Sequence, residues 1–123
     1  MNQIRVLVAD DHRVTRTALK HIFAVDPEMD VVAEATNAEE VFEKAKELQP
    51  DVIVLDIHMP GKDGLETLKQ LRKEQNNTPV VILTLSPPER MKNAAMSAGA
   101  TSFLSKDCNP EDLIQAVRNA VMK

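Results

Sequence analysis

Apolar runs and helix-like stripes alternate five times along the chain. Continuously apolar or β-branched runs, typical of buried strands, cover residues 4–9, 31–35, 51–55, 79–85 and 101–105. Between and after them, apolar residues recur every three or four positions, which predicts helices over 13–24, 38–49, 65–74, 87–99 and 110–122. This alternation indicates an α/β fold whose parallel strands are joined by right-handed helical crossovers.

Capping residues and prolines indicate where some of these helices begin and end, and apolar stripes indicate which face is buried. Asn37 and Asn109 precede the second and last helices as N-caps, and Pro50 ends the second helix. The first helix has an apolar stripe that we expect to form its buried face, made of Val14, Ala18, Ile22 and Val25.

The strands differ in polarity, and this difference predicts their order. Residues 52–55 and 80–83 are apolar throughout, as in strands covered on both faces. The run 31–35 contains Glu34, and 101–105 contains two serines and a threonine, so these two strands belong at the edges. We predict one doubly wound, flavodoxin-like domain over residues 1–123, with five strands in the order 2-1-3-4-5 and five helices.

The composition narrows the possible functions. With 123 residues, 43% of them apolar, the chain suits one domain with a substantial core. A net charge of −4 and an aromatic content of 2% argue against nucleic-acid binding by this domain alone. The sequence shows no membrane-length apolar run, no signal-peptide pattern and a single cysteine, Cys108. These features predict a cytoplasmic protein without a membrane partner.

Chemically active residues stand at the predicted carboxyl ends of the strands. The first strand leads into Asp10 and Asp11, the third into Asp56, the fourth into Thr84 and the fifth into Lys106. In an open parallel sheet of this order, ligands bind beyond these ends, at the switch point between strands one and three. Each residue alone could be a helix cap or a solvated tip. Because all five are expected at one edge, we predict that they form one site.

The charge of this site calls for a cation. Two like charges about 4 Å apart repel by about 4 kcal/mol at an effective dielectric constant near 20. The donors are oxygens, and none of the three histidines stands in an ExxH or HxxxH pattern, which favours Mg²⁺, with Mn²⁺ as a substitute. Since Mg²⁺ keeps coordination positions open for phosphate oxygens, the pattern indicates phosphoryl chemistry.

Over essentially its whole length, the chain resembles the receiver domain of two-component response regulators. The resemblance rests on the pair Asp10–Asp11, on LDIHMPGKDGLE around Asp56, on ILTL with Thr84 and on FLSK with Lys106. It implies that Asp56 accepts a phosphoryl group from a phosphohistidine of a sensor histidine kinase. It also implies a signalling domain that acts on no other substrate as an enzyme.

The resemblance implies a role for each site residue. Asp11, Asp56 and the backbone carbonyl of His58 would bind Mg²⁺ directly, and Asp10 would act through a water molecule. Lys106 and Thr84 would contact the phosphoryl oxygens.

A conformational switch is implied as well. Thr84 would move toward the phosphoryl group, and Phe103 would rotate inward, which reshapes the face formed by the fourth helix, fifth strand and last helix. The alternative for Phe103 is a static, half-buried aromatic on an edge strand. The kinase is expected to dock near Arg13 and Arg16, which otherwise only dilute the negative charge of the site. Phosphorylation-dependent formation of a homodimer is a further expectation.

Three positions near the site modify these expectations. Asp107 stands where the family often has a proline after the lysine. Leu85 replaces the small residue that commonly follows Thr84, so we expect it to restrict access to the phosphoryl group. The His58 imidazole is expected either to tune hydrolysis or to face solvent.

Several other functions of α/β domains fit the sequence less well or share its predicted fold. A flavin-binding protein needs a Ser/Thr/Gly-rich phosphate loop where this chain has ADDHR, and a dinucleotide-binding domain needs GxGxxG. An aspartate-nucleophile phosphatase carries a second acid two residues after the nucleophile, where this chain has His58. A stand-alone receiver that acts by protein contact, and a pseudo-receiver that only binds partners, share the predicted fold.

The sequences of two segments indicate what kind of output domain the receiver controls. MPGKDGLETL and SKDCNPEDLIQAVR resemble the NarL/FixJ-type transcriptional regulators. We therefore expect a DNA-binding helix-turn-helix domain after residue 123 in the natural protein, and control of transcription.

Overall fold

The fold is one parallel sheet between two layers of helices. The computed structural model describes residues 3–59, 61–85 and 89–122. The sheet has the order β2-β1-β3-β4-β5, with all neighbours parallel. Its strands are β1 (Ile4–Ala9), β2 (Met29–Ala35), β3 (Val52–Asp56), β4 (Val80–Thr84) and β5 (Ser102–Ser105). The predicted fold class and strand order, with β2 and β5 at the edges, are confirmed.

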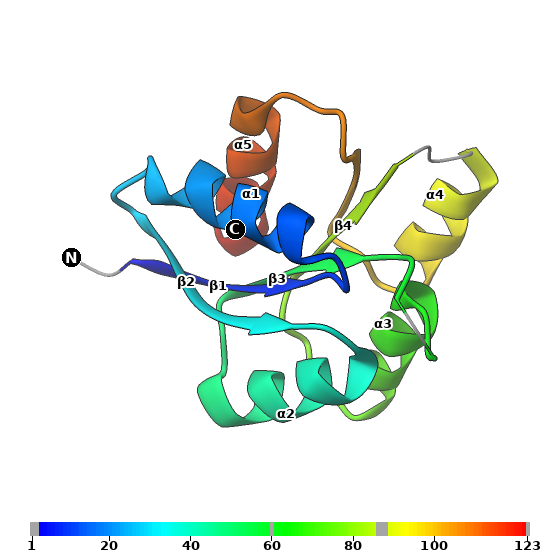
Figure 1. Cartoon of the computed structure of the whole chain (residues 1–123). Coiled ribbons are helices and arrows are strands. Elements are labelled where there is room, and N and C mark those ends of the chain that lie inside the picture. Colours follow the sequence, from blue (N-terminus) through cyan, green and yellow to red (C-terminus); the bar gives the residue numbers. More distant parts are fainter. Residues whose placement is uncertain (1–2, 60, 86–88, 123) are drawn as a thin grey trace.

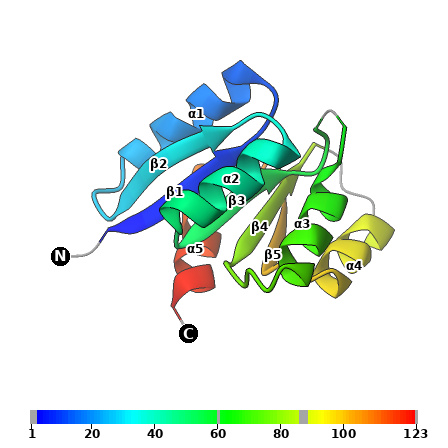
Figure 2. The same ribbon diagram turned by 90° about the horizontal axis from the view of Figure 1, so that it is seen from below.

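Five helices cover the two faces of the sheet. They are α1 (Arg13–Ala24), α2 (Ala38–Leu48), α3 (Gly64–Lys73), α4 (Glu89–Ser97) and α5 (Pro110–Val121). Figure 1 shows α1 and α5 above the sheet and α2 and α3 below it. Figure 2 shows α4 beside α3, on the same side as α2. No helix in the described ranges has the length and apolar character needed to cross a membrane.

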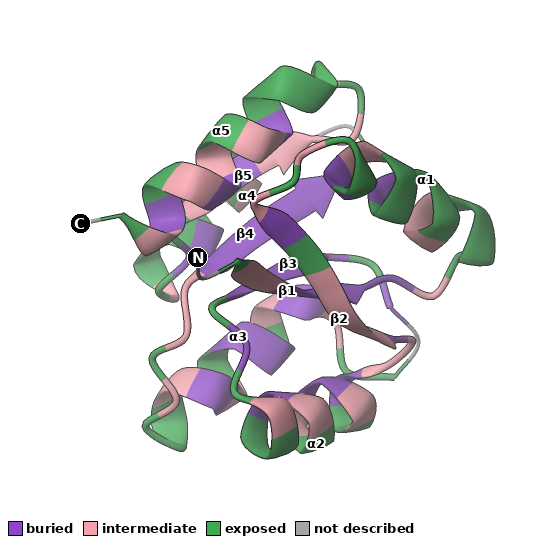
Figure 3. Cartoon of the chain, turned by 90° about the vertical axis from the view of Figure 1, so that its left-hand side faces the viewer, coloured by how far each residue is buried: buried purple, intermediate pink, exposed green. Residues whose placement is uncertain are grey.

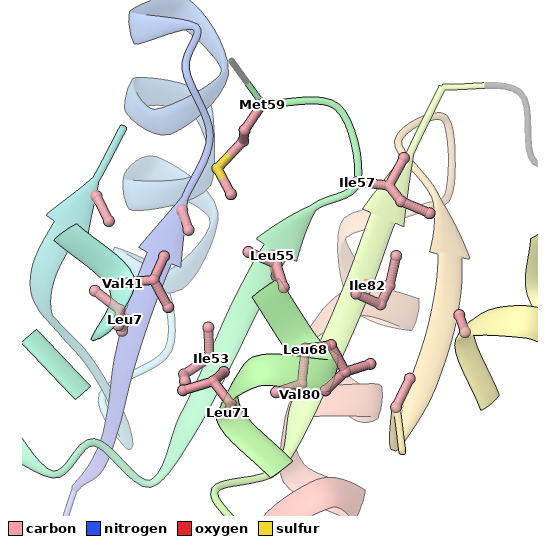
Figure 4. Packing of buried hydrophobic residues seen from close by; sticks show 14 of the residues in the cluster. Leu7, Val41, Ile53, Leu55, Ile57, Met59, Leu68, Leu71, Val80 and Ile82 are labelled. Carbon is pink, nitrogen blue, oxygen red and sulfur yellow. The ribbon is translucent and has the colours of Figure 1, made fainter. Parts of the chain in front are cut away.

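Successive residues of the central strands point into opposite layers, as the pleat requires. Ile53 and Leu55 face α2, α3 and α4, whereas Val52 and Val54 face α1 and α5. Figure 4 shows Ile53 and Leu55 of β3 between the side chains of the neighbouring strands, namely Leu7, Val80 and Ile82. Figure 3 shows that β3 and β4 are buried along their length while the outer faces of the helices are exposed.

The predicted buried face of α1 is wrong except at Ile22, which is partly buried against the core. Val14 and Val25 are each 82% exposed, and Ala18 is exposed as well. The buried residues of α1 are Leu19 and Phe23. This face lies about one position further along the chain, because the sheet accepts Leu19 and Phe23, whose large apolar side chains gain more from burial than the smaller valines left in solvent.

The predicted helix ends are mostly confirmed. The Asn37 side chain accepts a hydrogen bond from the backbone N–H of Glu40 at 3.0 Å, as an N-cap should. Asn109 occupies the N-cap position of α5 but makes no side-chain capping bond. The expected start of the fourth helix at residue 87 lies outside the described residues.

Candidate functional site

Three acids converge beyond the carboxyl ends of β1 and β3. Asp10 follows the last residue of β1, and Asp56 is the last residue of β3. Both are buried, with 1% and 3% of their surface exposed. One ligand atom from each of Asp10, Asp11, His12 and Asp56 lies within 4.8 Å of the others. Because β1 and β3 are parallel neighbours, residues distant in the sequence form one acidic cluster.

Lys106 brings a positive charge into this cluster. Its Nζ donates a hydrogen bond to Asp10 Oδ2 at 2.8 Å and lies 3.3 Å from Asp56 Oδ2. Burial by itself lowers the pKa of Lys106, but the hydrogen bond to Asp10 and the charges of Asp56 and Asp10 outweigh it, so the pKa is raised. Lys106 therefore stays protonated and links the ends of β1, β3 and β5.

Asp56 is held in an environment that disfavours its charge. Burial is the main cause that raises its pKa above the ordinary value, and the neighbouring charge of Asp10 raises it further. The backbone N–H of His58, which donates to Asp56 Oδ1 at 3.1 Å, and the charge of Lys106 oppose this rise only in part. The carboxylate thus lacks full compensation from the protein.

The loop after Asp56 is fixed by the start of α3. The backbone N–H of Gly64 donates to the carbonyl of Ile57 at 2.8 Å, and a Cβ on Gly64 would lie 2.6 Å from the carbonyl oxygen of Asp56. Only glycine permits this approach. Asp63 and Glu66 form a capping box that anchors the first turn of α3. Asp63 and Gly64 therefore hold the Asp56 backbone in place.

His12 belongs to the cluster, although its position beside the acids in the sequence favours a ligand role less than a role outside the site. Its Nδ1 lies 3.2 Å from Asp10 Oδ1 and 3.1 Å from Asp11 Oδ1. The signal in the sequence is its adjacency to the acidic pair, since His12 directly follows Asp11 and is the N-cap residue of α1.

The other predicted site residues surround the cluster at different depths. Thr84 is buried at the end of β4, and its carbonyl accepts the backbone N–H of Lys106 at 2.8 Å. Phe103 is 9% exposed and packs in the core beneath α4, more deeply than a half-buried edge residue. Leu85 is 61% exposed, and His58 is also exposed.

Two oxygens of the cluster suit a bound cation. Asp11 Oδ1 and Asp56 Oδ2 are buried and accept no hydrogen bond from the described residues, although His12 Nδ1 lies 3.1 Å from the first and Lys106 Nζ lies 3.3 Å from the second. A buried carboxylate oxygen that accepts no hydrogen bond is costly, and a metal ion satisfies it. The oxygen-rich set of Asp10, Asp11 and Asp56 fits a hard divalent cation such as Mg²⁺.

The fold and the site together define a doubly wound α/β domain with an acidic, lysine-bearing ligand site at the switch point of its sheet. The family model of the response regulator receiver domain matches residues 6–118. The chain belongs to this family, and the resemblance inferred from its motifs is confirmed.

Known proteins similar to the chain agree with this assignment. The nitrate/nitrite response regulator protein NarL of Escherichia coli is 41% identical over 115 residues, which cover 94% of this chain and 53% of NarL. The receiver domain of the putative response regulator NarL from Mycobacterium tuberculosis superposes with a TM-score of 0.93 at 29% identity, covering 98% of both chains. The response regulator domain of Thermotoga maritima CheB gives 0.90 at 35% identity, covering 98% of this chain and 97% of that one. The chain spans about half the length of the NarL protein that it matches.

Proposed function

We propose that this domain accepts a phosphoryl group on Asp56 from the phosphohistidine of a sensor histidine kinase, in a reaction that depends on Mg²⁺. The observation that carries the proposal is the buried Oδ2 of Asp56, which has no hydrogen-bond partner in the described structure and lies 3.3 Å from Lys106 Nζ. An anionic oxygen beside a fixed cation is a usable nucleophile toward phosphorus once its charge is screened.

The three acids would bind the cation in two ways, directly or through a water molecule. Asp11 and Asp56 offer oxygens that accept no hydrogen bond from the described residues, and the backbone carbonyl of His58 completes the protein ligands, as in the family pattern. Asp10 is already hydrogen-bonded to Lys106 and the backbone N–H of His12, which suits a role through water. When bound, Mg²⁺ screens the repulsion between the carboxylate and the incoming phosphoryl group.

Lys106 and Thr84 act on the transferred group. The transition state of phosphoryl transfer is loose and asks for positioning and charge stabilisation more than for covalent help. Lys106 supplies a positive charge from one side, and the Thr84 hydroxyl, at the end of the adjacent strand, supplies a hydrogen bond.

A conformational change around Thr84 would transmit the phosphorylation of Asp56 to the rest of the protein. Its movement toward the phosphoryl group alters the packing of Phe103, and with it the face formed by α4, β5 and α5. We propose that this face controls homodimer formation and a DNA-binding domain after residue 123. NarL is about twice as long as this chain, which leaves room for a further domain in such a protein. The transcriptional regulatory protein LnrK of Bacillus subtilis is 34% identical over 114 residues, which supports a transcriptional output. The alternative is a stand-alone receiver that signals by protein contact.

Direct labelling tests the proposal. The wild-type protein is incubated with Mg²⁺ and acetyl phosphate, and intact mass spectrometry measures its modification. We expect one phosphoryl group, stable to acid and labile to base, that is absent with EDTA or in Asp56→Asn. The exposed acid Asp30 provides the matched control, since Asp30→Asn should label like wild type. Labelling of Asp56→Asn would refute the proposal, and continuous hydrolysis of a phosphomonoester would indicate a phosphatase.

A further inference from the structure

The backbone carbonyl of Asp10 is satisfied by a side chain rather than by the sheet. β1 ends at Ala9, and the backbone N–H of Asp10 still bonds to the carbonyl of Ala35 on β2 at 3.0 Å. The Asp10 carbonyl accepts instead from Arg16 Nη1 at 2.7 Å. Because Asp10 is buried, its carbonyl would be costly to leave without a partner. Arg16 thus fixes the backbone at the point where the acidic pair begins.

Arg16 is itself held firmly. Its Nε donates to Glu34 Oε1 at 2.9 Å, and only 13% of its side chain is exposed. The second oxygen of Glu34 accepts from Lys20 Nζ at 2.9 Å, which fixes the carboxylate. Two hydrogen bonds on one planar guanidinium determine both its position and its orientation. The edge strand β2 therefore braces Arg16 against the turn after β1.

We infer that Arg16 is a positioning residue for the metal site: it sets the direction of the Asp10–Asp11 peptide, and thereby where both carboxylates point. The inference rests on the proposed Mg²⁺-dependent function. Nearby Arg13 is on the same helix but is exposed, and its side chain makes no hydrogen bond or ion pair within the described ranges. The two arginines, both candidates for kinase docking, therefore have different surroundings.

Charge and positioning predict opposite effects of removing Arg16. A guanidinium near the acids repels a divalent cation, so loss of its charge alone would strengthen Mg²⁺ binding. Loss of its hydrogen bonds would free the peptide and misplace the carboxylates, which weakens binding. Residues that orient metal ligands typically contribute about 10–100-fold in affinity. The sign of the change in affinity therefore separates the two roles.

Calorimetric titration of Mg²⁺ into the metal-free protein tests the inference, since the chain has no Trp or Tyr to report binding by fluorescence. We expect Arg16→Gln to raise the Kd about 10-fold. Arg16→Lys keeps the positive charge but loses the planar guanidinium, which donates to the Asp10 carbonyl and to Glu34 at the same time. It should therefore weaken Mg²⁺ binding at least as much as Arg16→Gln. Arg13→Gln, the matched control, should change the Kd less than about twofold because an exposed charge is screened. In Arg16→Gln without metal, the amide resonances of residues 10–12 should also shift.

The outcomes distinguish this inference from the proposed function. Wild-type protein that binds no Mg²⁺ contradicts the proposed function. Wild-type protein that binds Mg²⁺, with Arg16→Gln binding equally or more tightly, or Arg16→Lys binding like wild type, overturns the inference alone. If Arg16→Gln does not fold, Glu34→Ala loosens the guanidinium without removing it. That variant should weaken Mg²⁺ binding by a smaller factor, and an unchanged Kd would overturn the inference.

Discussion

Removing the charge of Asp56 should stabilise the metal-free domain while it abolishes the response to Mg²⁺. Asp56 is buried beside two other acids, and burial raises its pKa, so its ionised form destabilises the fold at neutral pH. The substitution Asp56→Asn removes the charge, keeps nearly the same shape and retains an oxygen for the backbone N–H of His58. Lys106 keeps its hydrogen bond to Asp10.

The size of the effect follows from the geometry. The ligand atoms of Asp10 and Asp11 lie within 4.8 Å of that of Asp56, so each repels it by about 3.5 kcal/mol at an effective dielectric constant of 20. Lys106 Nζ, at 3.3 Å, attracts Asp56 by about 5 kcal/mol on the same scale. The repulsions exceed the attraction by about 2 kcal/mol, before desolvation is counted. For a domain of this size, we expect Asp56→Asn to raise the Tm by about 8 °C in EDTA.

Thermal unfolding followed by far-UV circular dichroism measures this difference at pH 7. Mg²⁺ at ten times its Kd should stabilise wild type by about 1.4 kcal/mol and leave Asp56→Asn almost unchanged. The advantage of the variant should shrink as the pH falls toward 3.8 and below, since Asp56 then becomes neutral in both folded and unfolded states. Asp30→Asn should show neither effect. An Asp56→Asn protein that is no more stable than wild type in EDTA, or that responds equally to Mg²⁺, would refute the reasoning.

Three further predictions concern the loop, the edge strand and access to the site. Gly64→Ala should cost at least about 2 kcal/mol in urea denaturation, because its Cβ would strike the Asp56 backbone at 2.6 Å. Gly61→Ala, with a φ of 77° but open space, should cost only about 1 kcal/mol, and equal costs would contradict this explanation. Hydrogen bonds, first from Lys20, lower the pKa of Glu34, so its stabilising contribution is present above pH 4.5 and is lost as the pH falls through the lowered pKa. Glu34→Gln should therefore cost less than about 1 kcal/mol at pH 7 and nothing near pH 3; a cost that persists in acid would argue against it. Leu85→Ala should speed the loss of the phosphoryl group from Asp56 a few-fold in a mass-spectrometric time course, and an unchanged or slower rate would count against restricted access.

The acidic site was largely predictable because each of its residues directly follows or ends a strand with a strong apolar pattern. Once β1 and β3 are parallel neighbours, Asp10 and Asp56 must lie at the same edge of the sheet. The bracing of the Asp10 carbonyl by Arg16 and Glu34 was not predictable in this way. Nothing in the spacing shows which polar residue of a helix reaches a carbonyl beyond the end of a strand.

The sequence alone determined the α/β alternation, the edge positions of β2 and β5, and the acids at the strand ends, because each depends on local apolar patterns and on the rules for parallel sheets. The tertiary structure decided which face of α1 is buried, since Leu19 and Phe23 match a surface that the helix sequence does not describe. It also decided the depth of Phe103 and the contacts of His12 with the acids. These features depend on the shapes of neighbouring elements and on side-chain reach, and neither is encoded in the period of the pattern.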